Sequence, residues 1–138
     1  MTIHIRRLLA FWLVVGLAAG CAVVERIVPA PAPTTDEDPG AFAWAASAKG
    51  HRGADRKTFE YVCPELGHVH PIWGTDVYTD DSSVCTAAVH AGLIGLDGGG
   101  RVRIVIRPGL EAYVGTSRNG MISEDYGPWA GSFSFVGS

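Results

Sequence analysis

The stretch Tyr78-Thr-Asp-Asp-Ser-Ser-Val-Cys-Thr-Ala-Ala-Val-His-Ala-Gly92 decides the fold of this chain. Each side chain from Asp80 to Ser83 can accept hydrogen bonds from free backbone amides, and acidic groups suit the positive end of a helix dipole, so this group predicts a helix N-terminal cap. From Val84 to Ala91 the residues are small and apolar nearly all round, which is typical of a buried helix, and Gly92 favours a stop. We therefore expect one short central helix, wrapped by the rest of the chain.

Length and composition bound the architecture. The 138 residues suffice for one domain, and 47% hydrophobic with 18% charged residues is typical of a folded protein. The 18 glycines and 8 prolines indicate many turns, which favours an α+β or all-β fold. The formal charge of −3 argues against nucleic acid as a partner, because no basic excess is present to neutralise phosphates.

The N-terminal residues are predicted to be an export signal rather than part of the fold. Arg6 and Arg7 precede an apolar run from Leu8 to Leu17, and small residues follow, so residues 1–20 are interpreted as a signal peptide. The ending Ala-Ala-Gly-Cys resembles a bacterial lipobox, in which Cys21 is lipidated and becomes the new N-terminus. An ordinary signal peptide cut nearby and an uncleaved anchor remain open alternatives. The lipidated form predicts a lipoprotein held on the membrane of a bacterial cell envelope.

Residues 21–41 contain alternating proline and alanine followed by an acidic cluster. This composition favours an extended, solvated tether between the lipid and the domain. The folded domain is expected over residues 42–138.

Alternating apolar and polar residues predict the strands of this domain. In Arg101–Arg107 the apolar residues Val102, Ile104 and Ile106 face one side and three arginines the other. Ser117–Gly120 ends in the Asn-Gly pair that favours a tight hairpin turn. The other expected strands are Thr58–Cys63, Ile72–Tyr78, Glu111–Thr116, Met121–Glu124 and Trp129–Phe135.

Together these stretches resemble the LCCL domain family. The central pattern Tyr-x4-Ser-x-Cys-x-Ala-Ala-x-His-x-Gly is the most specific match, and the resemblance covers roughly residues 42–136. Further matching stretches are Tyr61–Pro64, Trp73–Tyr78, Gly98–Gly99, Arg107–Gly109, Tyr113, Asn119–Gly120 and Tyr126–Trp129.

This resemblance implies an α+β fold, in which a central α-helix is wrapped by two twisted β-sheets. It also implies an extracytoplasmic binding module without enzymatic activity, for which lipopolysaccharide, carbohydrate or protein ligands are expected. Animal members of the family commonly have a second disulfide, with one cysteine near the place that Gly67 occupies here.

The cysteines favour one internal disulfide. If Cys21 is lipidated, Cys63 and Cys85 remain as an even pair in an oxidising compartment. The bridge would tie the first core strand to the helix; two buried free thiols are the alternative.

His90 is the residue that most resembles a catalytic group. A serine triad would take its other members from Asp80–Ser83, but these lie at the start of the helix, two turns from His90. Cys85 lies five positions away and does not face His90 well. We interpret His90 as a structural histidine bonded to a neighbouring loop, and we predict no catalytic residue. An envelope hydrolase using His90 is the least favoured alternative.

No metal or cofactor site is predicted. His68 and His70 are two positions apart, a spacing that metals can use, but a third ligand is missing nearby. Gly98–Gly100 lacks the Lys-Ser/Thr of a phosphate-binding loop. The carboxylates near Asp80 lack the spacing of a calcium loop.

Arg101, Arg103 and Arg107 form the candidate ligand-binding site. They share one face of a strand in an otherwise acidic protein, and guanidinium groups suit phosphates and carboxylates. The plainer interpretation is that they keep an exposed sheet face soluble. The sequence thus predicts a non-catalytic binding module at the cell envelope, for a glycan, lipopolysaccharide or protein. An envelope scaffold without a small ligand is the alternative.

Overall fold

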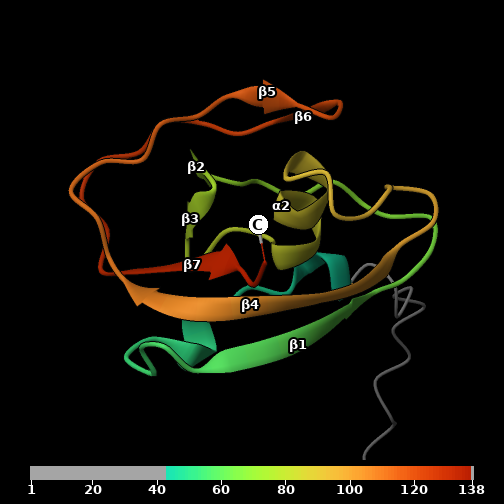
Figure 1. The fold of residues 1–138 in the computed structure, drawn as a ribbon. Helices are drawn as coiled ribbons and strands as arrows, with labels where there is room; N and C mark the ends of the chain where they lie inside the picture. The colour runs from blue at the N-terminus through green and yellow to red at the C-terminus, as the bar shows by residue number, and fades with distance from the viewer. Residues whose placement is uncertain (1–42, 138) are drawn as a thin grey trace, which may run out of the picture. The chain divides into compact units, whose positions relative to one another are not determined.

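The structure is a computed structural model that describes residues 43–137. The predicted signal peptide, Cys21 and the tether lie outside these residues. Seven strands and the helix α2 (Val84–His90) follow a 3-10 turn, η1 (Lys49–His51), in this part of the chain. The domain is α+β, as the sequence predicted (Figure 1).

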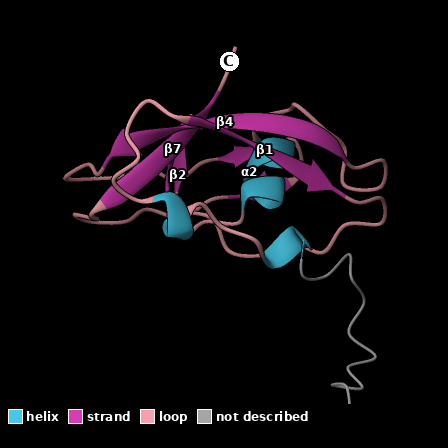
Figure 2. Cartoon of the chain, turned by 90° about the horizontal axis from the view of Figure 1, so that it is seen from below, coloured by secondary structure: helices cyan, strands magenta, loops and turns pink. Residues whose placement is uncertain are grey.

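The larger sheet is antiparallel and has the strand order β1-β4-β7-β3-β2. Because β1 and β2 are the two outer strands, residues on them lie at opposite edges of the sheet. Figure 2 shows β1, β4 and β7 crossing the domain beside its short helical segments. The bounds of the strands are β1 (Thr58–Cys63), β2 (Gly74–Thr75), β3 (Val77–Thr79), β4 (Gly100–Pro108) and β7 (Gly131–Phe135).

The second sheet is the hairpin of β5 (Ser117–Arg118) and β6 (Met121–Ile122). Asn119 and Gly120 both have positive φ at its turn, at 50° and 77°, which is the conformation that an Asn-Gly pair favours. The α2 helix contacts both β1 and β6, and it lies between the two sheets (Figure 1). This confirms the predicted central helix.

All seven residues of α2 are buried, which explains its small side chains. Its apolar residues join one core cluster with Trp44 and with Val102, Ile104 and Ile106 of β4. The alternation in β4 therefore divides the strand into a core face and a solvent face, as predicted.

Two predicted strands have a different course in the structure, and two others are shortened, Met121–Glu124 to β6 and Trp129–Phe135 to β7. The segment Ile72–Tyr78 is not one strand, because the chain reverses at Asp76 (φ 64°) and pairs Thr75 with Val77. The expected strand Glu111–Thr116 contributes only an isolated bridge, between Tyr113 and Tyr126. Regular pairing of that hairpin is confined to β5 and β6.

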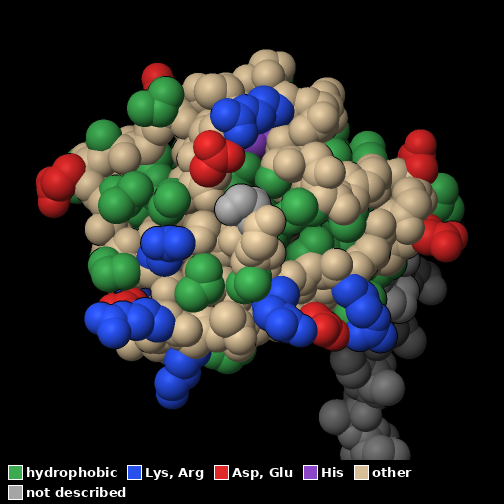
Figure 3. All heavy atoms as spheres, viewed as in Figure 1, with side chains coloured by type: hydrophobic (Ala, Val, Ile, Leu, Met, Phe, Trp, Pro, Cys, Tyr) green, Lys and Arg blue, Asp and Glu red, His purple; other side chains and the backbone are tan. Residues whose placement is uncertain are grey.

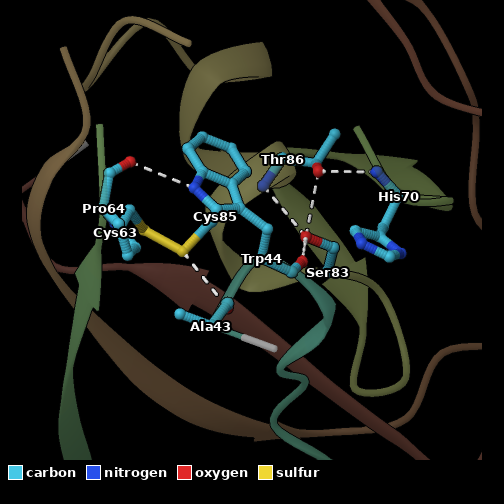
Figure 4. Close-up of a disulfide and its surroundings, with 8 residues drawn as sticks. All are labelled: Ala43, Trp44, Cys63, Pro64, His70, Ser83, Cys85 and Thr86. Carbon is cyan, nitrogen blue, oxygen red and sulfur yellow. Dashed lines mark hydrogen bonds between the residues drawn. A yellow bond between two sulfur atoms is a disulfide. The ribbon is translucent and has the colours of Figure 1, made fainter. Parts of the chain in front are cut away.

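The Cys63–Cys85 disulfide joins the end of β1 to the first turn of α2, and the Cα atoms are 5.6 Å apart. Figure 4 shows Trp44 packed beside this bridge, where its indole Nε1 donates to the carbonyl of Pro64 at 3.1 Å. Both cysteines are buried, so the bridge is part of the core. The predicted disulfide is confirmed over the alternative of two free thiols.

Among the described residues, no helix has the length and apolar character needed to cross a membrane.

Candidate functional site

The solvent face of β4 carries the three predicted arginines. Arg101, Arg103 and Arg107 are all exposed and alternate with buried residues. Figure 3 shows Lys and Arg side chains along the lower part of the face that it displays, where Figure 1 places β4 and β1. The fold thus presents these guanidinium groups on the side of the sheet away from α2.

Arg101 and Arg103 border the same surface hollow, of about 240 Å³. Its other lining residues are Glu60 of β1, Val102 and Val136. The Nη1 atom of Arg101 donates to Oε1 of Glu60 at 2.7 Å. The Arg103 side chain has no ion-pair or hydrogen-bond partner within residues 43–137. These two arginines therefore form a shared concave cationic surface with one carboxylate at its side.

Arg107 is held differently. Its Nε donates to Oγ of Ser134 on β7 at 2.6 Å, and it does not line the hollow. The structure therefore brings together Arg101 and Arg103, while Arg107 extends the same cationic face toward the other end of the strand.

Glu60 belongs to this surface and was not predicted from the sequence. In the antiparallel register it lies directly opposite Arg103, while its carboxylate bonds to Arg101. The only sequence signal was its polar position in the alternating segment Thr58–Cys63. The register that places it between two arginines depends on strand pairing, which the local pattern does not reveal.

His90 is fully buried and both of its ring nitrogens are bonded. Nε2 faces the carbonyl of Thr116 at 3.0 Å and donates to it, because a carbonyl can only accept. Nδ1 lies 2.8 Å from the hydroxyl of Tyr78, which donates to it in the neutral ring. Burial raises the pKa of Tyr78 to about 12, so this hydroxyl keeps its proton. His90 therefore has the surroundings of a structural histidine, and its burial and two occupied ring nitrogens argue against a hydrolase that would use it.

The interpretation of the acidic pair as the helix cap is wrong for Asp80. Ser83 is the N-cap residue, and its Oγ accepts from the amide of Thr86 at 3.0 Å. Asp80 is instead fully buried, and it receives Nε and Nη2 of Arg52 at 2.6 and 2.7 Å and the indole Nε1 of Trp129 at 2.8 Å. Asp80, in the loop before α2, therefore connects the segment after η1, which holds Arg52, with the loop before β7, which holds Trp129.

Asp80 is held in its charged form. Burial alone would raise the pKa of its carboxyl, but the hydrogen bonds from Arg52 and Trp129 outweigh burial, and the pKa lies below its ordinary value. Arg52 also lies over the Trp129 ring, 5.4 Å from its centroid. Since the carboxylate is enclosed by these partners, we interpret it as architectural.

A second hollow lies away from the β4 face. It has a volume of about 580 Å³ and lies at the C-terminal end of α2, and its lining includes Leu93, Leu96 and Met121. No group of three or more His, Cys, Asp or Glu side chains within residues 43–137 is arranged to hold a metal ion. The backbone amide of His70 donates to Oγ1 of Thr86, so its loop is fixed against α2.

Comparison with known proteins identifies the family. A family model described as the LCCL domain matches residues 43–133. Human cochlin is 32% identical over 121 residues, which is 85% of this chain and 21% of cochlin. Human cysteine-rich secretory protein LCCL domain-containing 2 is 46% identical over 57 residues, 41% of this chain and 12% of that protein. Clotting factor C of Tachypleus tridentatus is 41% identical over 64 residues, 46% of this chain and 6% of that protein.

The chain spans at most about a fifth of the length of these relatives, so the comparison concerns one domain of each. All three are animal proteins, and the bacterial lipoprotein type stays a prediction. The family model matches about two thirds of the chain, which includes the helix, the disulfide, β1 to β6 and the first part of β7. The chain therefore belongs to the LCCL domain family.

Proposed function

We propose that this protein is a non-catalytic binding module that recognises an anionic glycan through the arginine face of β4. The observation that carries the proposal is the hollow shared by Arg101 and Arg103, where two exposed guanidinium groups converge beside Val136. Guanidinium groups donate paired hydrogen bonds to sulfate, phosphate and carboxylate oxygens, and a flat row of them suits a repeating anionic chain. Arg107 lengthens the row along the strand.

Electrostatics supports an anionic ligand at this place. The protein as a whole has a formal charge of −3, so no overall positive charge attracts anions, and attraction depends on local groups such as the three arginines. Because the three side chains are exposed, their attraction is screened by salt, and binding should weaken as ionic strength rises.

The test is binding of dextran sulfate to the domain, with uncharged dextran as the ligand control. Replacing Arg101, Arg103 and Arg107 with Ser should weaken dextran sulfate binding about tenfold to a hundredfold, since each exposed charge contact is worth about 0.5 to 1 kcal/mol. A second variant, Lys49→Ser and Arg118→Ser, removes two positive charges that neither line the hollow nor lie on a segment bonded to β4, and it should weaken binding much less. Equal loss per charge removed in both variants would show that only net charge matters and would refute a site on β4.

The membrane anchor is a separate part of the proposal. We infer that Cys21 is lipidated and that residues 21–41 tether the domain to the envelope surface. The lipobox-like sequence, the disulfide that an oxidising compartment favours, and the secretory relative support export. Palmitate labelling of cells should mark the wild-type protein and not Cys21→Ser; unchanged labelling would exclude lipidation at this residue.

An envelope scaffold without a small ligand is the second candidate. The hollow at the end of α2 favours it, because Leu93 at its border is 44% exposed and offers an apolar contact for another protein. Crosslinking in cells distinguishes the two functions. Protein crosslinks at Leu93, together with no saturable binding of dextran sulfate, would favour the scaffold.

A further inference from the structure

We propose that Glu60 is an internal competitor for the ligand, whose carboxylate occupies the arginine hollow when the ligand is absent and is displaced when an anionic group binds. The inference rests on the proposed function, since it concerns the same surface. It assigns to Glu60 the role of setting the affinity of the hollow for anions.

The position of Glu60 suits a competitor. It lines the same hollow as Arg101 and Arg103. Its Cα is paired with that of Arg103 across β1 and β4, while its Oε1 accepts from Nη1 of Arg101 at 2.7 Å. The carboxylate therefore bonds one guanidinium group, and its residue lies across the strand pair from the residue that carries the other. This is the place in which a sulfate or carboxylate of a ligand would have to sit.

The ion pair between Glu60 and Arg101 is weak enough to open. The side chains of Arg101 and Glu60 are 70% and 49% exposed, so water replaces their contact at little cost. Exposed ion pairs contribute between nothing and about 1 kcal/mol, because solvent screening and side-chain entropy offset the attraction. A multivalent anion that contacts both arginines can therefore displace Glu60, which contacts one.

Glu60 differs from Asp80 in its access to a ligand. The Asp80 carboxylate also pairs with an arginine, but it is fully buried and accepts three hydrogen bonds, so a ligand has no access to it. Glu60 has a single bond at an open surface. The Asp80 carboxylate therefore stabilises the fold, whereas the Glu60 carboxylate can move away from its arginine.

The chain offers a matched control for Glu60. Asp76 forms another exposed ion pair, with Arg118 at 2.8 Å and side-chain exposures of 70% and 44%. It lies between β2 and β3, at the opposite edge of the sheet from β1. Asp76 has a positive φ, which Asn tolerates well, so Asp76→Asn is conservative. Both Glu60→Gln and Asp76→Asn remove one negative charge and one exposed ion pair, but only the first acts in the hollow.

The experiment measures the affinity of dextran sulfate for the wild-type protein and the two variants by calorimetry, at the same salt concentration. Glu60→Gln should bind about three- to fivefold more tightly than the wild type, which corresponds to loss of a competing contact of up to about 1 kcal/mol. Asp76→Asn should change the affinity by less than about twofold, through net charge alone. Circular dichroism and thermal unfolding of the same samples confirm that each variant is folded.

The outcomes separate this inference from the function on which it rests. If Glu60→Gln binds no more tightly than Asp76→Asn while the triple serine variant loses binding, Glu60 is not a competitor and the β4 site stands. If neither the wild type nor Glu60→Gln binds dextran sulfate above uncharged dextran, the proposed function fails and the competitor role fails with it.

Discussion

Removing the disulfide tests how the fold holds its central helix. Replacing both Cys63 and Cys85 with Ala releases the end of β1 from the first turn of α2. The two residues are separated by 22 positions. In the chain-entropy description, a loop of this length gives about 3.4 kcal/mol of stabilisation at 25 °C, because the bridge restricts the unfolded chain.

The native state adds a smaller contribution of the same sign. Cys63 is 2% exposed and Cys85 is fully buried, so each alanine leaves a small cavity where a sulfur atom packed. The total loss should therefore be about 3 to 5 kcal/mol. Since small domains have roughly 5 to 15 kcal/mol of stability, the variant should be marginally folded at best.

The assay is urea unfolding at 25 °C, followed by tryptophan fluorescence. The double variant should have a lower midpoint and a larger denaturant slope, because its unfolded chain is less compact. Wild-type protein unfolded in the presence of a reductant is the control, since it loses the loop restraint and keeps the sulfur atoms. A loss below about 1 kcal/mol with an unchanged slope would refute the argument that the bridge restrains the unfolded chain.

Three more substitutions test the buried polar contacts. Asp80→Asn should lower the melting temperature at neutral pH, because Arg52 and Trp129 lose a charged acceptor. The folded-state pKa of Asp80 is depressed, so its contribution to folding stability is present above the unfolded pKa of about 3.9 and is lost as pH falls through the folded value. The difference in melting temperature between the variant and the wild type should therefore close in that acid range. A constant difference down to about pH 2 would contradict this. Ser83→Ala should lower the free energy of unfolding in urea by about 1 to 2 kcal/mol, because the α2 cap and the hydrogen bond to the Trp44 carbonyl at 2.7 Å are both lost. A loss within error of zero would show that Ser83 is not needed as a cap. Gly131→Ala should lower the melting temperature, because a Cβ there would overlap the enclosed Asp80 carboxylate; an unchanged melting temperature would mean that the carboxylate is free to shift.

The regular elements could be predicted because their signals are local. The alternation from Arg101 to Arg107 is the direct consequence of one buried and one exposed sheet face, and β4 has that pattern. The all-round small residues of α2 follow from its place between two sheets. The Asn119-Gly120 turn was evident because few other pairs adopt positive φ at both positions.

The predictions that failed concern contacts between segments that are distant in the sequence. Nothing near Asp80 in the sequence indicates that Arg52 and Trp129 converge on it, so the cap was the nearest local explanation. The reversal at Asp76 was missed because this φ is uncommon for a residue other than glycine. The candidate site was predicted only in part: the three arginines shared a strand face, but the pairing that adds Glu60 depends on the register between β1 and β4.

The central claim is that anions bind at the β4 face, and amide chemical shifts during titration with dextran sulfate test it most directly. The largest changes should fall on Arg101 to Arg103, on Glu60 across the strand pair and on Val136, which together line the hollow. Uncharged dextran should leave these amides unchanged. Changes that cluster instead around Leu93, Leu96 and Met121, with β4 unaffected, would contradict the account.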